Sequence, residues 1–280
     1  MIEKSFLETL HNNFSDVIEC ERITFKKNSL NGKVIIIDDL VTKSIDLKRE
    51  KLSLENEKNA RINFPQQTLP LLAIWKNSDT GFIVYKKESA FIELGWRSWE
   101  YFMKNNLYKR LLIPEKIFSV NTERWFWELD TLFPITENKR MKVICDQIAE
   151  KISFARVGCH KQIKLTHCHG DLLPSNVIIT KKLTAKLIDW TNGGLCPVFY
   201  DQLVPVFYGG KEKILSEQFI KKIQFLGRKF NIELSFVEAK SQIITSCCYY
   251  YKYNMFRHSV VNREQVNEGI NVLNRVLRVL

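Results

Sequence analysis

The sequence predicts an α+β protein with two lobes: a small lobe built on an antiparallel β-sheet and a larger, mainly helical lobe. Residues 1–88 contain short β-branched runs separated by turn residues, which is typical of antiparallel strands. Residues 212–280 show the periodicity of helices. Between these regions, Gly170 and Pro174 interrupt a polar segment that two short apolar runs follow. We expect the small lobe to comprise residues 1–88 and the helical lobe residues 89–280.

Length and composition fit a globular protein of this kind. The chain has 280 residues, of which 45% are hydrophobic, enough for a substantial core. No apolar run approaches the roughly 18 residues of a membrane span, and the N-terminus lacks the layout of a signal peptide. Seven cysteines at irregular spacing indicate reduced thiols. The sequence therefore predicts a cytoplasmic protein without a transmembrane segment.

The formal net charge of +11 is compatible with nucleic acid, an anionic membrane surface or an anionic substrate as a partner. The basic residues are spread along the chain, and no nucleic-acid-binding motif accompanies them. A solvated basic surface is the simpler interpretation, so nucleic acid is not expected. Peripheral contact with an anionic membrane remains open. The positive charge also disfavours a polycationic ligand, which would prefer an acidic cleft.

The small lobe begins with a predicted helix over residues 3–20. A three-stranded antiparallel meander follows, with strands at 21–27, 33–37 and 40–45 and a turn at 28–32.

The rest of the small lobe is a polar helix and a hairpin. The helix is expected over residues 48–64 and ends at Pro65. The hairpin strands are expected at 71–75 and 82–86. The predicted small lobe therefore contains the N-terminal helix, five strands and one further helix.

The large lobe is predicted to be mainly helical. From Ala90 the pattern turns helical and rich in aromatic residues, most of which we expect to pack in the core. A short strand at 165–167 leads into the interrupted segment, and residues 191–197 are expected to form a loop. The predicted helices cover residues 138–157, 212–230, 234–256 and 263–280.

The interrupted segment reads His169-Gly170-Asp171-x-x-x-x-Asn176. Gly170 and Pro174 make it a loop rather than a helix. Strands are expected at 177–180 and 186–188, and Asp189 follows the second. The two strands therefore deliver two carboxylates and one amide towards one place.

Phosphoryl transfer needs such a set of side chains. One carboxylate orients the attacking hydroxyl and accepts its proton, while an amide oxygen and a second carboxylate hold Mg²⁺ against the phosphates. Protein kinases use H-R-D-x-x-x-x-N followed by D-F-G. A zinc site at His167, Cys168 and His169 is the alternative. Neighbouring strand residues point to opposite faces, however, and no second ligand pair follows at zinc spacing.

The segment resembles the aminoglycoside phosphotransferase and choline kinase group of small-molecule kinases. Their signature is H-G-D-x-x-x-x-N followed by I-D-W or I-D-F, and Tyr200-Asp201-Gln202-Leu203 resembles their Y-D-L segment. The resemblance implies a two-lobed, protein-kinase-like fold. It also implies that Asp201 supports the catalytic loop from the start of a helix. The implied site residues are Asp171 as catalytic base, His169 as a brace of the loop, and Asn176 and Asp189 as Mg²⁺ ligands.

The same resemblance assigns the nucleotide side of the site, with ATP and Mg²⁺ as cofactors. Lys43 on the third strand would contact the phosphates, and Gly32 belongs to the loop that would cover them. Glu57 on the polar helix would pair with Lys43, with Glu55 and Glu50 as rivals. Residues 85–89 would form the hinge that receives the adenine.

The expected function is ATP-dependent transfer of the γ-phosphoryl group to a hydroxyl of a small molecule or glycan. We rank a sugar or glycoconjugate first, then choline or another amino alcohol, then an aminoglycoside. Thr191 stands where many relatives carry an acid, and the phosphate loop has a single glycine. A nucleotide-binding pseudokinase with a regulatory or interaction role is therefore the alternative. A basic nucleic-acid-binding module would need a contiguous basic groove.

Overall fold

The structure is a computed structural model in which the chain forms two compact units. The first comprises Met1–Leu111 and Pro174–Gly193, and the second Leu112–Leu173 and Gly194–Leu280. The lobe boundary expected after residue 88 stays a prediction, because residues 94–115 lie outside the described residues. The structure describes residues 23–29, 32–37, 40–47, 53–76, 79–88, 90–93, 116–132, 159–180, 184–208 and 216–259.

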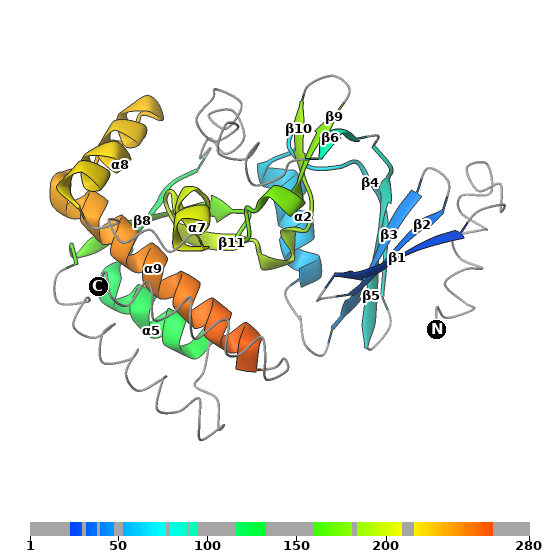
Figure 1. Ribbon diagram of the computed structural model, residues 1–280. Helices are drawn as coiled ribbons and strands as arrows, with labels where there is room; N and C mark the ends of the chain where they lie inside the picture. The colour runs from blue at the N-terminus through cyan, green and yellow to red at the C-terminus, as the bar shows by residue number, and fades with distance from the viewer. Residues whose placement is uncertain are drawn as a thin grey trace. The chain divides into compact units, whose positions relative to one another are not determined.

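A five-stranded antiparallel sheet forms the centre of the first unit (Figure 1). The order is β1-β2-β3-β5-β4, so the predicted meander and the predicted hairpin meet where β3 pairs with β5. Both predictions are confirmed, with ends that differ by up to two residues in the described part. The strands are β1 (Ile23–Ser29), β2 (Gly32–Ile37), β3 (Leu40–Asp46), β4 (Leu71–Lys76) and β5 (Thr80–Lys86).

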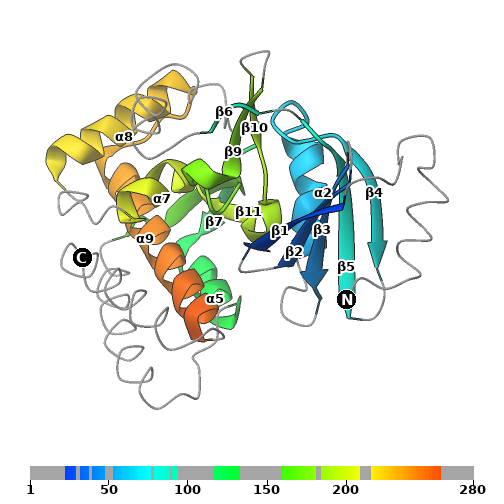
Figure 2. The ribbon, with the colours of Figure 1, turned by 45° about the vertical axis from the view of Figure 1, so that its right-hand side comes forward.

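Helix α2 (Ser53–Asn63) runs alongside this sheet in Figure 2. Its Leu54 packs against Ile45 of β3 and Ile83 of β5. Side chains alternate along a strand, so Lys43 shares the α2-facing side of β3 with Ile45. The helix confirms the prediction over 53–63, while residues 48–52 lie outside the described residues.

A second small sheet in the first unit carries the end of the interrupted segment. A 3₁₀ turn, η1 (Pro174–Asn176), leads directly into β9 (Val177–Thr180), which pairs with β10 (Ala185–Leu187) and with β6 (Ala90–Glu93). The two predicted strands are confirmed. The expectation of helix from Ala90 is wrong at β6, because four residues there complete the free edge of β9.

The second unit combines a three-stranded sheet with helices. The sheet order is β11-β8-β7, with β7 (Phe118–Asn121), β8 (Gln162–Cys168) and β11 (Gly194–Pro197). The helical pattern expected at β7 and the loop expected at β11 are wrong, because both segments are strands. Both strands form because they pair along the two edges of the buried strand β8. The described helices are α5 (Thr122–Leu132), α7 (Tyr200–Tyr208), α8 (Glu217–Lys229) and α9 (Phe236–Ser259).

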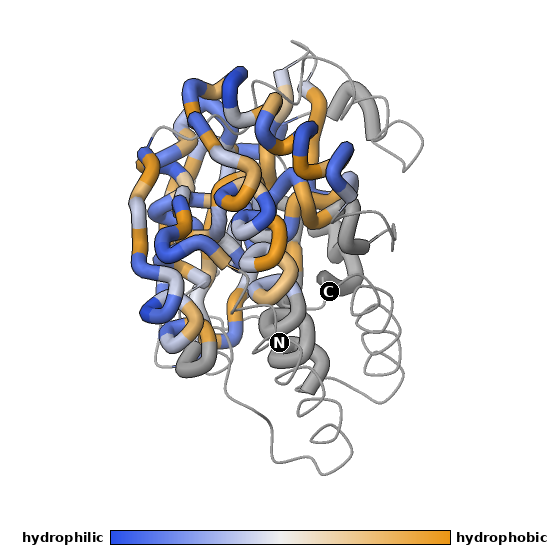
Figure 3. The backbone as a smooth tube through the Cα atoms, turned by 90° about the vertical axis from the view of Figure 1, so that its left-hand side faces the viewer, coloured by the Kyte–Doolittle hydropathy of each residue, from blue (hydrophilic) through white to orange (hydrophobic). Residues whose placement is uncertain are grey.

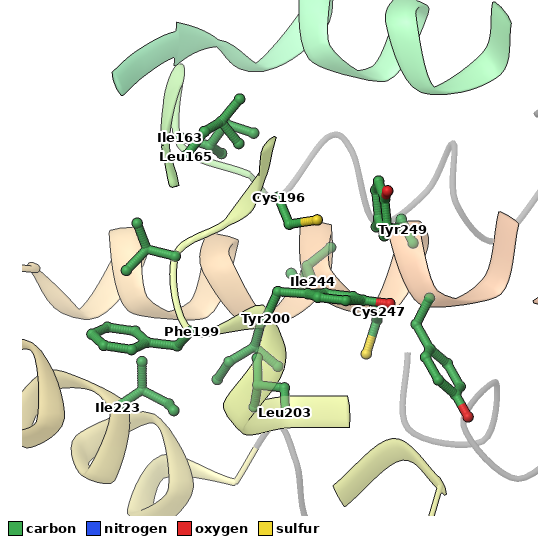
Figure 4. Packing of buried hydrophobic residues seen from close by; sticks show 14 of the residues in the cluster. Ile163, Leu165, Cys196, Phe199, Tyr200, Leu203, Ile223, Ile244, Cys247 and Tyr249 are labelled. Carbon is green, nitrogen blue, oxygen red and sulfur yellow. The ribbon is translucent and has the colours of Figure 1, made fainter. Parts of the chain in front are cut away.

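The core of the second unit surrounds α9, whose residues 241–250 are all buried (Figure 4). Apolar and polar residues are interleaved along the coloured parts of the tube in Figure 3, as expected for amphipathic elements. Cys247 and Cys248 are free thiols inside the core, which confirms the packing role expected for them. Helices α8 and α9 confirm two predictions. The helices expected at 3–20, 138–157 and 263–280 lie outside the described residues.

No helix in the described ranges combines the length and the apolar character that crossing a membrane requires.

Candidate functional site

Lys43 and Asp189 come together in the first unit. The Lys43 side chain on β3 is only 7% exposed. Its Nζ donates a hydrogen bond to Asp189 Oδ1 over 2.5 Å, which forms an ion pair. The strand register places Lys43 between Val34 of β2 and Ile83 of β5, so the backbone of this lysine is held on both sides. A buried ammonium needs such a partner, because an unpaired charge in the interior is strongly unfavourable.

Asp189 lies at the start of a tight turn, with φ of 63° and ψ of 60°. This left-handed conformation is uncommon outside glycine, but aspartate adopts it more readily than most residues. The 3₁₀ turn η2 (Trp190–Asn192) follows, and Thr191 Oγ1 donates to Asp189 Oδ1 over 2.6 Å. Two donors therefore converge on one carboxylate oxygen.

Asn176 is tied to the same segment through the backbone. It is buried at the end of η1, and its carbonyl accepts a hydrogen bond from Ile188 N–H at 3.0 Å. Asn176 directly precedes β9, and Asp189 comes two residues after β10, so the two residues predicted to bind a metal flank paired strands of one small sheet. A carboxylate and an amide oxygen are hard ligands of the kind that Mg²⁺ prefers, so the donor set fits this ion.

Glu57 is 1% exposed and contacts the turn instead of Lys43. Its Oε1 accepts from Trp190 N–H at 3.1 Å, and its Oε2 pairs with Arg61 at 3.2 Å. The expected Lys43–Glu57 pair is absent among the contacts of the described residues. The physical reason is that Arg61, one turn along α2, supplies the positive charge that Glu57 needs.

Of the rivals for the role of Glu57, Glu55 is exposed and Glu50 lies outside the described residues.

The end of β5 adds a tyrosine to this buried group. The guanidinium of Arg61 lies 5.0 Å from the ring centroid of Tyr85, a cation–π arrangement. Burial raises the pKa of Tyr85 well above its ordinary value, and the negative charge of Glu57 raises the pKa further. The tyrosine is therefore neutral across the physiological range. The predicted hinge at 85–89 stays a prediction.

The part of the interrupted segment that ends at Leu173 lies in the second unit, where Asp201 supports it from the first turn of α7. The two oxygens of Asp201 accept from His169 N–H at 2.7 Å and from Gly170 N–H at 2.8 Å. Gly170 has φ of 84°, which favours glycine. Asp171 N–H donates to His169 Nδ1 at 3.3 Å, and the Asp171 side chain is half-buried. The two hydrogen bonds to Asp201 give the support expected from it, while the role of His169 stays a prediction.

Asp201 is also electrostatically unusual. Burial raises its pKa to about 7, although the hydrogen bonds from His169 and Gly170 favour the charged form and oppose this rise. The negative charge of Asp171 raises the pKa of Asp201 further. Burial is the dominant cause because this side chain is fully enclosed.

The contacts of the described residues do not test the roles predicted for Gly32 and Asp171. Gly32 is the first residue of β2, opposite Ser29 of β1, and the residues between them lie outside the described residues. Its contact with phosphate stays a prediction. The role of Asp171 as a base also stays a prediction.

Sequence reasoning missed two residues that contact the site, Asn56 and Arg61, and it noted Thr191 only as a departure from the family pattern. Arg61 follows Glu57 by four residues, a spacing that signals an ion pair on a helix. Asn56 Nδ2 donates to Thr191 O at 2.9 Å, a long-range contact with no signal in the sequence.

The fold is protein-kinase-like, that of small-molecule kinases. The sequence itself matches no protein-family model and no curated protein. Solved structures with the same fold include aminoglycoside phosphotransferases and a choline kinase. At identities of 9–13%, the likeness shows the fold.

Three of these structures illustrate the likeness. A thermostable mutant of the aminoglycoside phosphotransferase APH(4)-Ia, in a ternary complex with AMP-PNP and hygromycin B, has 10% identity, 99% coverage of both chains and a TM-score of 0.62. The aminoglycoside phosphotransferase APH(2″)-IIia with GDP and kanamycin has 13% identity, covers 97% of this chain and 98% of its own, and has a TM-score of 0.60. Choline kinase LicA from Streptococcus pneumoniae has 11% identity, coverage of 97% and 99%, and a TM-score of 0.60.

Proposed function

We propose that the protein transfers the γ-phosphoryl group of a nucleoside triphosphate, ATP first, to a hydroxyl group of a small molecule or glycan. The observation that carries this proposal is the ion pair between Lys43 and Asp189, on a segment that is hydrogen-bonded to Asn176. The pair joins a cation suited to phosphate with a carboxylate suited to a metal. Solved structures of the same fold contain AMP-PNP or GDP, which supports nucleotide binding.

Each residue of the proposed site has a separate role in the reaction. Asn176 and Asp189 hold Mg²⁺, and Lys43 contacts the phosphates. When bound, Mg²⁺ neutralises negative charge on the phosphate oxygens. Asp171 orients the acceptor hydroxyl and takes its proton as the new oxygen–phosphorus bond forms. The bond between the γ-phosphorus and the bridging oxygen breaks, and the nucleoside diphosphate leaves with its electron pair.

The acceptor proposal keeps a sugar or glycoconjugate hydroxyl first, then choline or another amino alcohol, then an aminoglycoside. The net charge of +11 supports this order, because it favours a neutral or anionic acceptor over a polycation. Solved neighbours include proteins named for aminoglycosides and for choline, so the fold itself is compatible with the second and third of these classes.

The acceptor is tested by incubating the protein with γ-labelled ATP and one acceptor class at a time, with and without EDTA. We expect Mg²⁺-dependent transfer of label to a sugar or glycoconjugate. Label on an aminoglycoside alone would overturn the order of acceptors. No label on any class, together with no ATP hydrolysis, would favour the pseudokinase alternative.

The pseudokinase alternative rests on Thr191 and on the single glycine in the phosphate loop. The Thr191 hydroxyl donates directly to the carboxylate of Asp189. We favour an active enzyme because the three polar residues that phosphoryl transfer needs, Asp171, Asn176 and Asp189, are all present.

A further inference from the structure

Thr191 combines a buried position with a direct bond to a proposed metal ligand. The residue is 5% exposed, and its Oγ1 lies 2.6 Å from Asp189 Oδ1. The carboxylate can only accept in this pair, so the hydroxyl is the donor. Burying a hydroxyl without a hydrogen bond is costly, which makes this contact a fixed part of the turn.

Hydrogen bonds from side chains of α2 and from within the turn fix the main chain around Thr191. Asn56 Nδ2 donates to Thr191 O at 2.9 Å, and Trp190 N–H donates to Glu57 Oε1 at 3.1 Å. Gly193 N–H closes the turn on Trp190 O at 2.8 Å. The threonine hydroxyl therefore sits on an anchored backbone, and its direction is set before any ligand binds.

Asp189 Oδ1 accepts from both Lys43 and Thr191, but the two donors differ. The lysine is a long, flexible cation that is also the proposed contact of the phosphates. The Thr191 side chain is short and fixed to the turn. Its hydroxyl therefore restrains the Asp189 carboxylate even when the Lys43 ammonium moves to contact the phosphates. Partners that fix the direction of a metal ligand strengthen metal binding.

We infer that Thr191 is a positioning residue that orients the Asp189 carboxylate for Mg²⁺. This inference rests on the proposed function, because it requires Asp189 to bind the metal that accompanies a nucleotide. Thr191 thereby contributes to the metal site through Asp189 without contacting the substrate.

The test compares the affinity for AMP-PNP with Mg²⁺ and with EDTA, by calorimetry, in the wild type and in Thr191→Val, Thr191→Ala and Thr191→Ser. We expect Mg²⁺ to tighten binding to the wild type. Thr191→Val and Thr191→Ala, which lack the hydroxyl, should lose about tenfold of that gain. Thr191→Ser, which keeps the hydroxyl, should retain most of it, and the EDTA values should agree among the four proteins.

The outcomes separate this inference from the function on which it rests. Equal gains from Mg²⁺ in the wild type and in the variants without the hydroxyl would overturn the role of Thr191 alone. Weaker binding in both Mg²⁺ and EDTA would show a merely structural role, and it would also overturn the inference. If the wild type gains nothing from Mg²⁺, the proposed metal site fails. Unfolding midpoints without ligand identify any misfolded variant, and Thr191→Ala then replaces Thr191→Val.

Discussion

Asp201 shows how one buried side chain can hold a loop at an electrostatic cost. Its two oxygens accept from consecutive backbone N–H groups, and such bonds normally lower the pKa of a carboxyl group. Enclosure outweighs them here and raises the pKa to about 7. The carboxyl is thus partly protonated near neutral pH, and its effect on stability depends on pH.

The stability contributed by Asp201 should fall as the pH rises from about 4 to about 7. An unfolded aspartate has a pKa of about 3.9, so between these values the folded protein keeps a proton that the unfolded chain has lost. The contribution is complete below about pH 4, and the full difference is on the order of 4 kcal/mol. Urea unfolding of the wild type and of Asp201→Asn, at several pH values between about 4 and 8, measures it.

The difference in unfolding free energy between the two proteins isolates Asp201 from other titrating groups. We expect this difference to decline with rising pH and to level off above about 7. A difference that stays flat over this range would mean that the hydrogen bonds outweigh burial, so that Asp201 is charged throughout.

Asp171 is the residue on which turnover should depend. Replacement by asparagine keeps the shape of the side chain but removes the proton acceptor. We expect Asp171→Asn to lower turnover by at least about a hundredfold, while the affinity for Mg·ATP stays within about twofold. Steady-state kinetics and calorimetry check the two parts. Turnover close to that of the wild type would refute the role of Asp171 as the base.

At the scale of elements, α2 links the sheet to the turn that bears Asp189. Its buried stripe contains Glu57 between Ser53 and Ala60, so a charged residue lies where a core residue would be expected. The charge is compensated within the helix by Arg61, and the remaining oxygen of Glu57 holds Trp190 N–H. Phe64, just after the helix, stacks on the Trp190 ring with centroids 5.2 Å apart. The helix therefore fixes the turn through polar and aromatic contacts together.

A pair of double-mutant cycles tests which residue Glu57 pairs with in the nucleotide-free protein. The first combines Glu57→Gln with Arg61→Met, and the second combines Glu57→Gln with Lys43→Met. Residues in contact show interaction energies of roughly 0.5–3 kcal/mol in the free energy of unfolding. We expect a value in this range for Glu57 and Arg61, and about 0.3 kcal/mol or less for Glu57 and Lys43. The reverse order would restore the pairing expected from the sequence.

The elements show how far the sequence predicts this fold. The strands around Lys43 and the strand after Asn176 were predictable, because their β-branched runs are bounded by turn residues. Strands β6 and β11 have four residues each and no clear alternation, so only pairing with β9 or β8 creates them. Strand periodicity and motif spacing are local, whereas edge pairing depends on tertiary structure.

The candidate site divides in the same way. The spacing of Asp171, Asn176 and Asp189 was visible in the sequence, and so was the candidate lysine on the third strand. The partner of Lys43 was not visible in the sequence. The predicted helix contains several acidic residues, and the sequence does not show which face of the helix is buried. The hydroxyl of Thr191 was noted only as a departure from the family pattern, and its bond to Asp189 emerged from the backbone of the turn.

For the whole molecule, the fold is shared with small-molecule kinases at 9–13% identity, while the identifiable pattern is a few polar residues at fixed spacing. A fold alone does not define an activity, so the proposed function depends on the site. We propose that the first unit binds a nucleotide together with a metal through Lys43, Asn176 and Asp189.

Thermal unfolding with and without Mg·ATP, on the wild type and on Asp189→Ala, tests that claim most directly. For each protein, the unfolding midpoint with Mg·ATP is compared with the midpoint without it. This comparison cancels the destabilisation caused by removing the partner of Lys43. At about 100 times its dissociation constant, the ligand should stabilise the wild type by roughly 2.7 kcal/mol. We expect a clear upward shift of the unfolding midpoint for the wild type and little or none for Asp189→Ala. No shift in either protein, or equal shifts in both, would contradict it.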